Sequence, residues 1–249
     1  MNNLVSIITP SFNSSKFITE CIESVLNQTY KNWEMFIVDD CSDDNSKEII
    51  STYSIKDKRI KPVFLEKNVG AAEARNVAIR QSKGKYVAFL DSDDLWNPEK
   101  LDKQLSFMKE NKIAFSFSTY QFMSEDGKEL TNIIIAPEKM TYNSYLKNTI
   151  IGCLTVIIDR EKTGKFEMPN IRSSHDMALW LLIMKRGFSA YGLDENLSKY
   201  RVVSSSNTSN KIKAAKEVWD VYRKVEKLNL FYASLCFLGY AFNAVKKRL

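Results

Sequence analysis

The sequence is poor in the residues that build zinc centres and disulfide frameworks. It contains one histidine and four cysteines among 249 residues. The cysteines, Cys21, Cys41, Cys153 and Cys236, are scattered without C-x-x-C spacing. That scatter excludes the usual zinc-ligand and disulfide patterns, so we expect buried, reduced thiols.

The first residues lack the features of an export signal. Met1-Asn2-Asn3 leads directly into the apolar run Val5–Ile8, with no basic segment before a long hydrophobic stretch. We therefore expect no signal peptide and a cytoplasmic location. Hydrophobic residues make up 44% of the chain and charged residues 27%, which is the balance of an ordered globular protein.

An excess of basic charge is missing from most of the chain. Residues 211–249 hold nine Lys and Arg against three Asp and Glu, which accounts for the whole formal charge of +6 and leaves residues 1–210 neutral. A uniformly basic surface would have suggested nucleic acid, so nucleic acid is not an expected partner. A neutral body with a basic, aromatic tail favours an anionic membrane surface instead.

The first hundred residues alternate short apolar runs with segments of helical period, which is the pattern of βαβ units and a parallel sheet. The predicted strands are Val5–Ile8, Glu34–Val38, Ile60–Leu65 and Tyr86–Leu90. Helices are predicted over 17–26, 45–53, 71–81 and from Pro98 to Glu110. Asn97 is expected to cap the last of these helices, with Pro98 at its first position.

The second half has a mixed order of elements. Strands are predicted over 113–119, beyond a turn at 125–128, over 154–158 and over 200–203, and helices from Tyr142 and over 176–186. We expect the sheet to gain antiparallel strands here. The fold class is α/β, a Rossmann-like mixed sheet flanked by helices, with a polar hinge over 204–210 and a C-terminal helical tail that breaks near Asn229.

Two acidic clusters, at residues 39–40 and 91–94, follow predicted strands. Ligands of open α/β sheets bind beyond the carboxyl ends of the strands, so both clusters are expected beside a ligand. Converging carboxylates repel one another unless a cation joins them, and oxygen ligands suit Mn²⁺ or Mg²⁺, which can grip a diphosphate. Asp43, Asp44 and Asp94 have a simpler interpretation as helix caps.

Taken in order, the motifs resemble glycosyltransferase family 2. The matching runs are Val5–Asn13, Ser24–Tyr30, Phe36–Asp40, Asn68–Gly70 with Ala74–Asn76, and Phe89–Asp94. The resemblance covers roughly residues 4–201 and implies the GT-A fold, a nucleotide-sugar donor, of which UDP-sugar is favoured, and inversion at the anomeric carbon. It extends more loosely to bacterial transferases that build O-antigen, capsule or teichuronic-type polymers on lipid-linked acceptors.

The resemblance implies roles for single residues on the donor side. Thr9, Pro10 and Phe12 would form the loop beside the nucleobase. Asp40 would hydrogen-bond the base, and Arg75 would make a further contact with the donor.

The same resemblance makes Asp91 and Asp93 the D-x-D pair of the metal site. Asp93 would bind the metal directly, while Asp91 beside it would hold the ribose or sugar of the donor. Arg201 matches an arginine that closes over the diphosphate, although the histidine often found after it is absent.

The resemblance to the family makes Asp176 the predicted catalytic base, because it matches the second residue of the family's acidic pair, which precedes a Leu-Trp-Leu helix. Its carboxylate could accept the proton of an acceptor hydroxyl, although a helix N-cap would suit it equally well. His175 departs from the Glu usual at its position, and a local hydrogen-bonding role is the simpler interpretation. Trp180 is interpreted as a core residue, with stacking on the acceptor as the alternative.

These observations predict a catalytic domain over 1–210, with a nucleotide-sugar-binding half (1–110) and an acceptor-binding half (111–210), followed by a basic amphipathic tail (211–249). A nucleotidyltransferase is a rival, but residues 9–13 contain no glycine for a triphosphate loop. A non-catalytic nucleotide- or carbohydrate-binding subunit is a second rival, which the departure at His175 leaves open. The transferred sugar, the acceptor linkage and the oligomeric state also stay open.

The tail contains an uncharged stretch, Leu228–Val245, followed by basic residues 246–248. At 1.5 Å per residue it reaches roughly 27 Å, marginal against a hydrocarbon core of about 30 Å, so we expect it to lie on the inner membrane surface. The steps of three and four residues predict one continuous apolar stripe of Val221, Val225, Leu228, Tyr232, Leu235, Leu238, Phe242 and Val245. The stripe could instead pack on the catalytic domain or pair with another subunit.

Overall fold

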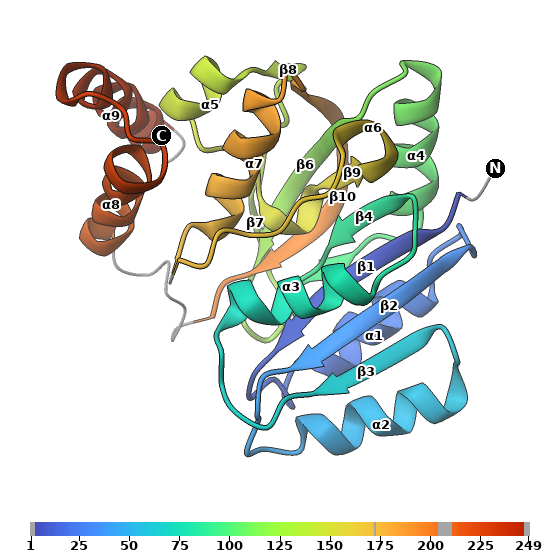
Figure 1. Cartoon of the computed structure of the whole chain (residues 1–249). Helices are drawn as coiled ribbons and strands as arrows, with labels where there is room; N and C mark the ends of the chain where they lie inside the picture. The colour runs from blue at the N-terminus through green and yellow to red at the C-terminus, as the bar shows by residue number, and fades with distance from the viewer. Residues whose placement is uncertain (1–2, 172, 204–210, 247–249) are drawn as a thin grey trace.

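The structure is a computed structural model that describes residues 3–171, 173–203 and 211–246. A mixed sheet lies between two layers of helices, and a helical tail packs at one side (Figure 1). The strands are β1 (Val5–Ser11), β2 (Trp33–Asp39), β3 (Ile60–Phe64), β4 (Tyr86–Phe89), β5 (Leu95–Trp96), β6 (Phe115–Met123), β7 (Leu130–Ile134), β8 (Lys139–Met140), β9 (Ile157–Asp159) and β10 (Ala190–Arg201). The helices of the body are α1 (Ile18–Leu26), α2 (Ser46–Lys56), α3 (Ala71–Gln81), α4 (Lys100–Glu110), α5 (Tyr142–Lys147), α6 (Arg160–Thr163) and α7 (His175–Lys185), with a 3-10 turn, η1 (Cys153–Thr155).

The strand order is β3-β2-β1-β4-β9-β6-β10-β5, with β7 beside β6 and β8 beside β10. The strands β1 to β4 are parallel to one another, as the alternating apolar and helical segments predict. From β9 onward the sheet is mixed, because β9 runs antiparallel to both β4 and β6 while β10 runs parallel to β6. The predicted gain of antiparallel strands is confirmed.

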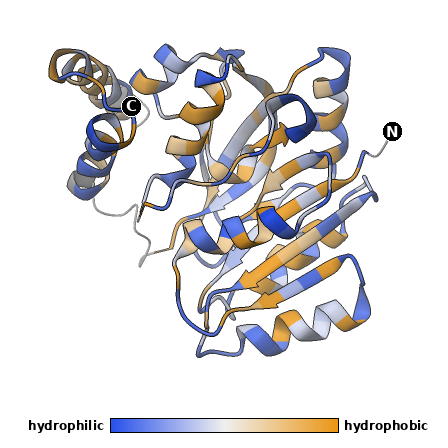
Figure 2. Ribbon diagram, viewed as in Figure 1, coloured by the Kyte–Doolittle hydropathy of each residue, from blue (hydrophilic) through white to orange (hydrophobic). Residues whose placement is uncertain are grey.

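Alternation along the strands divides the core between the two faces of the sheet. In β1, Ile7 packs in a cluster with α1, α2 and α4, and its neighbour Ile8 packs in a cluster with α3, α5 and α7. Side chains that are successive in a strand point to opposite faces, so these buried apolar strands need helices on both sides. Figure 2 shows the apolar residues gathered along the strands.

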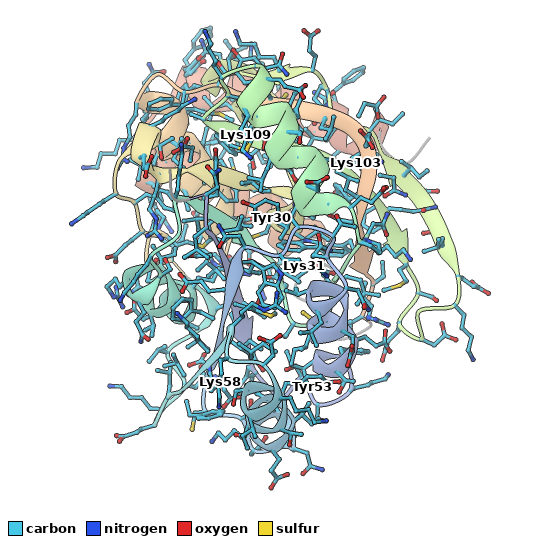
Figure 3. The ribbon with its side chains drawn as sticks, turned by 90° about the vertical axis from the view of Figure 1, so that its right-hand side faces the viewer. Tyr30, Lys31, Tyr53, Lys58, Lys103 and Lys109 are labelled. Atoms are coloured by element: carbon cyan, nitrogen blue, oxygen red, sulfur yellow. The ribbon has the colours of Figure 1, made fainter. Side chains whose placement is uncertain are left out.

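The outer surface of the α1, α2 and α4 layer is polar. Figure 3 turns this layer toward the viewer, with Lys103 and Lys109 on α4 and Tyr53 and Lys58 at α2 and just beyond it. Lys103 pairs with Glu99 at 3.0 Å and with another surface carboxylate at 2.8 Å. Each of these helices therefore has one apolar face toward the sheet and one polar face toward solvent.

The motif Ser24–Tyr30 has a structural purpose in this layer. Gln28 is fully buried, and its Nε2 donates to the backbone oxygens of Ser24 and Asn97 at 3.0 and 2.8 Å. Its Oε1 accepts from the backbone N–H of Leu101 at 3.1 Å. A buried amide with both ends satisfied fixes the start of α4 against α1, next to the acidic segment 91–94.

The capping prediction at Asn97 is wrong. The helix α4 begins at Lys100, two residues after Pro98, with Glu99 at its N-cap position. The side chain of Asn97 donates to the backbone oxygen of Asn196 at 2.6 Å instead. The side-chain amide of Asn97 is therefore hydrogen-bonded to strand β10, whereas the sequence pattern predicted that it caps the helix.

Two strands differ from their predicted bounds for identifiable reasons. The strand β10 begins at Ala190, whereas only residues 200–203 were predicted, because register shifts between Leu193 and Ser198 break the two-residue alternation. The predicted strand 154–158 is divided, because its first two residues lie in the 3-10 turn η1 and the strand β9 begins only at Ile157. Most other predicted elements occur within a few residues of their expected ends.

The tail forms α8 (Lys211–Asp220), a π-helical turn η3 (Val221–Val225) and α9 (Leu230–Lys246), so the predicted break near Asn229 is confirmed. Buried Glu226 anchors the turn, since it accepts from the hydroxyl of Tyr142 and pairs with Lys185 at 2.6 Å. The helix α9 packs against α5, with Tyr232 donating to Asn143 at 2.9 Å. The predicted hinge 204–210 and the basic residues 247–248 lie outside the described residues.

The predicted single apolar stripe of the tail is wrong. Val221 is buried and Val225, Leu228 and Tyr232 pack on the body, whereas Leu235, Leu238 and Phe242 face solvent. The stripe is divided because the chain leaves the helical path between η3 and α9. No helix of the described residues is long and apolar enough to cross a membrane.

Candidate active site

The acidic clusters lie at one edge of the sheet, where the chain order reverses. Strand β1 lies between β2 and β4, and the chain runs outward from β1 to β3 before it returns to β4. The register pairs Ser11 with Asp39 and Ile8 with Phe89, so the ends of β1, β2 and β4 open on the same side. Such a switch point is where open α/β sheets bind ligands.

Thr9 and Pro10 belong to β1 rather than to a loop, which corrects the sequence prediction. Proline has no N–H group to donate to a neighbouring strand. It is tolerated at Pro10 because the pairing of β1 with β4 ends at Ile8, so no partner strand is present on the side that its nitrogen faces. The hydroxyl of Thr9 is buried without a hydrogen-bond partner among the described residues. Phe12 follows the strand and is 52% exposed, so its ring is free to stack. The nucleobase contacts of these residues stay predictions.

The loop after β1 is fastened to the loop after β2. The backbone N–H groups of Asn13 and Ser14 donate to the hydroxyls of Ser42 and Ser46, each at 2.9 Å. Asp44 accepts from the backbone N–H groups of Ser15 and Ser46, each at 2.9 Å, so part of its carboxylate does serve the start of α2. These contacts make the two loops one wall of the site.

Asp40 connects β2 to the loop that precedes α3. Its two carboxylate oxygens accept from the backbone N–H groups of Val69 and Gly70, at 2.7 and 2.8 Å. Gly70 has a φ of 86°, a left-handed conformation that favours glycine. A cavity of about 370 Å³ lies between residues 68–72 and residues 170–171. Through these two hydrogen bonds Asp40 holds the loop before α3 in its conformation. The predicted hydrogen bond between Asp40 and a nucleobase stays a prediction.

The segment 91–94 gathers three carboxylates in a partly dehydrated turn. Burial raises the pKa of Asp93 to about 6, with the charge of Asp91 as the next cause. Burial followed by the charge of Asp93 also raises the pKa of Asp94 well above its ordinary value. Asp94 accepts from the backbone N–H of Arg201 at 2.9 Å, so its interpretation as a helix cap is wrong. The carboxylate of Asp94 instead binds the end of β10, which the sequence pattern does not place beside segment 91–94.

Arg201 is 2% exposed, and each nitrogen of its guanidinium group donates one hydrogen bond to the protein. Nε donates to the backbone oxygen of Asp93 at 2.8 Å, Nη1 to that of Glu125 at 2.8 Å and Nη2 to the carboxylate of Glu20 at 2.6 Å. Arg201 therefore holds the D-x-D segment and the loop after β6 together. Its predicted contact with a diphosphate stays a prediction, since Nη1 and Nη2 each carry a second N–H group.

Arg75 joins the donor side to the predicted base. It lies on α3 with only 5% exposure, and its Nη2 donates to the carboxylate of Asp91. Its Nη1 lies 2.6 Å from Nε2 of His175, the first residue of α7. Asp176 follows in the first turn of α7, with Ser174 at the N-cap, so Asp176 is not the capping residue. Burial lowers the pKa of Arg75, but the charge of Asp91 and, to a smaller extent, that of Asp176 raise it above its ordinary value.

Trp180 is confirmed as a core residue. It is fully buried, and its ring lies 5.3 Å from that of Phe89 and 5.4 Å from that of Phe115. It anchors α7 on the sheet and so fixes the level at which Asp176 lies.

Several residues near the site carry no signal in the sequence. Glu20 reads as an exposed position of α1, and Glu125 belongs to the turn after β6, yet both meet Arg201. Cys153 lies near Arg75, and burial raises the pKa of its thiol well above the ordinary value. Only the contacts between distant segments identify these residues.

The carboxylates fit a shared cation rather than a closed protein cage. No group of three or more His, Cys, Asp or Glu side chains within residues 3–171, 173–203 and 211–246 is arranged to hold a metal by itself. Asp91 and Asp93 offer carboxylate oxygens, which Mg²⁺ commonly takes together with oxygens of phosphate groups and water. Burial and then the charge of Asp91 raise the pKa of Asp93, and such a cation would offset both by favouring the ionised carboxylate.

This raised pKa predicts how metal binding depends on pH. Below about pH 6 the carboxyl group of Asp93 is mostly protonated. Protons therefore compete with a cation for this carboxylate as the pH falls. We expect the affinity for Mn²⁺ to fall by about tenfold between about pH 7 and pH 5. Calorimetric titration of the protein with Mn²⁺ at both pH values measures it. Equal affinities would exclude ionised Asp93 as a ligand.

The sheet, its switch point and the D-x-D segment define a transferase with the GT-A fold. The family model described as Glycosyl transferase family 2 matches residues 6–167, and the chain belongs to this family. The family match excludes the nucleotidyltransferase alternative.

The chain is similar over nearly its whole length to curated bacterial glycosyltransferases. It is 55% identical over 246 residues to the "Putative teichuronic acid biosynthesis glycosyltransferase TuaG" of Bacillus subtilis (strain 168), covering 99% of this chain and 98% of that one. It is 44% identical over 219 residues to the "UDP-Glc:alpha-D-GlcNAc-diphosphoundecaprenol beta-1,3-glucosyltransferase WfgD" of Escherichia coli, covering 88% and 85%.

Solved structures support the fold. TarS 1–349 of S. aureus in complex with UDP-GlcNAc superimposes with a TM-score of 0.72 at 23% identity, covering 95% of this chain and 71% of that one. The mannosyltransferase PcManGT from Pyrobaculum calidifontis in complex with GDP-Man and Mn²⁺ gives a TM-score of 0.70 at 16% identity, covering 99% and 71%. The predicted GT-A fold is confirmed.

Proposed function

We propose that this protein transfers a hexose or N-acetylhexosamine from a UDP-sugar to a hydroxyl of a lipid-linked saccharide, with inversion, in the synthesis of a bacterial surface polysaccharide. The observation that carries the proposal is the position of Arg75, which contacts both Asp91 of the D-x-D pair and the first turn of α7, where Asp176 lies. The name of WfgD, which specifies UDP-Glc and a diphosphoundecaprenol acceptor, supports the choice of substrates.

The reaction uses one carboxylate of this chain as the base. The oxygen of the acceptor hydroxyl attacks the anomeric carbon while its proton passes to the carboxylate of Asp176. The bond between that carbon and the diphosphate oxygen breaks, and UDP leaves with the electron pair. Attack from the face opposite the leaving group inverts the configuration. The exposed ring of Phe12 is proposed to stack on uracil and Asp40 to contact the base, beside Thr9 and Pro10.

Asp93 and Asp91 would hold Mn²⁺ or Mg²⁺ together with the diphosphate. The cation supplies positive charge that offsets the charge of the leaving diphosphate. Arg201 keeps the backbone of Asp93 in place through its contact at 2.8 Å, so the pair is oriented before the donor binds.

A donor panel tests the proposal. Purified protein with Mn²⁺ is incubated with UDP-, GDP- and other nucleotide-sugars, with and without a bacterial lipid extract, and nucleotide release is measured. We expect UDP release from a UDP-hexose or UDP-N-acetylhexosamine that the lipid extract increases. Nucleotide binding without release from any donor would favour the non-catalytic alternative, and release of another nucleotide would overturn the choice of UDP.

We also propose that α9 rests on the inner face of the cytoplasmic membrane. Phe231, Leu235, Leu238 and Phe242 follow a spacing of three and four residues and face solvent, with Phe231 76% and Phe242 70% exposed. The tail that carries this face has a net charge of +6 in sequence, which complements anionic lipid. Docking there would bring the site to a lipid-linked acceptor. The boundary between catalytic domain and tail at residue 210 is part of the same proposal.

Flotation with vesicles tests the membrane contact. We expect the full chain to float with anionic vesicles, and the variant Phe231→Ser/Leu238→Ser/Phe242→Ser to bind at least about tenfold less, because three apolar side chains no longer enter the interface. The matched control is Ile55→Ser, which removes a 73% exposed apolar side chain from α2. Equal flotation of both variants, or a stable dimer that forms without lipid through α9, would contradict the proposal.

A further inference from the structure

The only histidine of the chain contacts a buried arginine across the two halves of the protein. Nε2 of His175 lies 2.6 Å from Nη1 of Arg75, and the two residues are 100 positions apart in sequence. The other terminal nitrogen of Arg75 donates to Asp91. Arg75 therefore connects His175, which directly precedes the proposed base, to Asp91 of the D-x-D pair.

The chemistry of this contact fixes the state of the imidazole. A guanidinium group keeps its protons and only donates hydrogen bonds, so Nε2 of His175 must accept. The ring is then neutral, with its proton on Nδ1. Burial, and next the charge of Arg75, lower the pKa of His175, in keeping with a neutral ring. Because the imidazole is uncharged, it does not repel the guanidinium group, and Arg75 stays paired with Asp91.

The segment that precedes α7 is joined to α3 by a second contact. Asn76, the residue after Arg75, is buried and exchanges two hydrogen bonds with the backbone of Met168, at 2.7 and 2.9 Å. Ser174, just before His175, has a φ of 55°, a conformation that non-glycine residues rarely adopt. The chain therefore turns sharply to present His175 to Arg75, which is a directed contact rather than the result of a free surface side chain.

We propose that His175 is a positioning residue that sets the affinity for the nucleotide donor. Its neutral Nε2 holds the guanidinium of Arg75 in the one orientation that keeps Nη2 on Asp91. Without that acceptor Arg75 can rotate, and Asp91 loses the partner that orients it toward the donor. The proton transfer assigned to Asp176 does not depend on this contact. The inference rests on the proposed use of a UDP-sugar.

Two replacements of similar length separate the acceptor from the shape of the side chain. His175→Gln places an amide oxygen where Nε2 lies, and His175→Met fills the same space without a strong acceptor. We expect the glutamine variant to keep the donor KM within about twofold and the methionine variant to raise it about tenfold, with kcat changed by less than about threefold. A fall in kcat at constant KM would assign His175 to the chemical step and overturn the inference.

A double-mutant cycle tests whether His175 acts through Arg75. Arg75→Lys removes the fork that contacts both partners, so His175→Met should add little to its effect on the affinity for UDP. Additive losses would overturn the inference. Affinity for UDP with Mn²⁺, measured by calorimetry, needs no turnover. Wild-type protein that binds no UDP would refute the proposed function, whereas UDP binding that is equal in the glutamine and methionine variants would refute only the role of His175.

If His175→Met does not fold, His175→Asn replaces it. The asparagine oxygen lies nearer the Nδ1 position and is too short to reach Arg75, while the side chain stays polar. It should show the same loss of UDP affinity, with a melting temperature that reports folding separately. An asparagine variant that binds UDP as wild type does would overturn the inference.

Discussion

Replacing Asp93 by alanine is expected to abolish metal-dependent sugar transfer. The carboxylate lies in a turn where burial and the charge of Asp91 raise its pKa to about 6, so a bound cation would stabilise its ionised form. Without it the charge of the leaving diphosphate is not offset, and we expect turnover to fall by at least about a thousandfold. UDP release with Mn²⁺ measures the effect.

The control for this variant is Asp102→Ala, which removes an exposed carboxylate from the first turn of α4 without touching the site. It should keep wild-type turnover. Calorimetry of Mn²⁺ with UDP gives a second readout, because the Asp93 variant should lose metal-dependent UDP binding. Activity of the Asp93 variant close to that of Asp102→Ala would remove Asp93 from the metal site.

Asp176→Asn is expected to separate binding from chemistry. Asparagine has the same shape but cannot take a proton, so kcat should fall by about 100-fold or more while the affinity for UDP stays within about twofold. The side chain lies in the first turn of α7 beside His175. Steady-state kinetics with a saturating donor and UDP calorimetry give the two quantities.

Asp176→Glu serves as the companion variant, since it keeps a carboxylate but displaces it by one methylene group. Partial recovery of kcat relative to Asp176→Asn would support the role of a base. Loss of UDP affinity or of the folded state in both variants would instead make Asp176 a structural residue of α7.

The sheet was predictable because its strands carry their own signal. The runs that became β1, β2 and β4 are mostly apolar, short and separated by helical segments, and burial on both faces requires that composition. The same reasoning brought residues 39–40 and 91–94 to one edge, since parallel strands end together. Where the ladder is irregular, as in β10, alternation fails and most of the strand was missed.

The tail shows the limit of periodicity. Steps of three and four residues identified an apolar surface on 221–245. The sequence pattern continues between η3 and α9, although the chain does not form one continuous helix there. Glu226 is buried against Tyr142 and Lys185 at that break, so Val221 turns toward the body while Phe242 stays exposed. Packing, rather than period, decided which apolar residues are left for a partner.

Most element types, the α/β class and the acidic residues at the strand ends follow from local sequence, because these depend on neighbours within a few positions. Which side chains meet depends on the tertiary structure. Arg75 contacts His175 across 100 positions, and Arg201 contacts Glu20 across 181. A guanidinium group can donate to any nearby oxygen or nitrogen, so its partners follow from where the folded chain brings acceptors, and no local pattern records that.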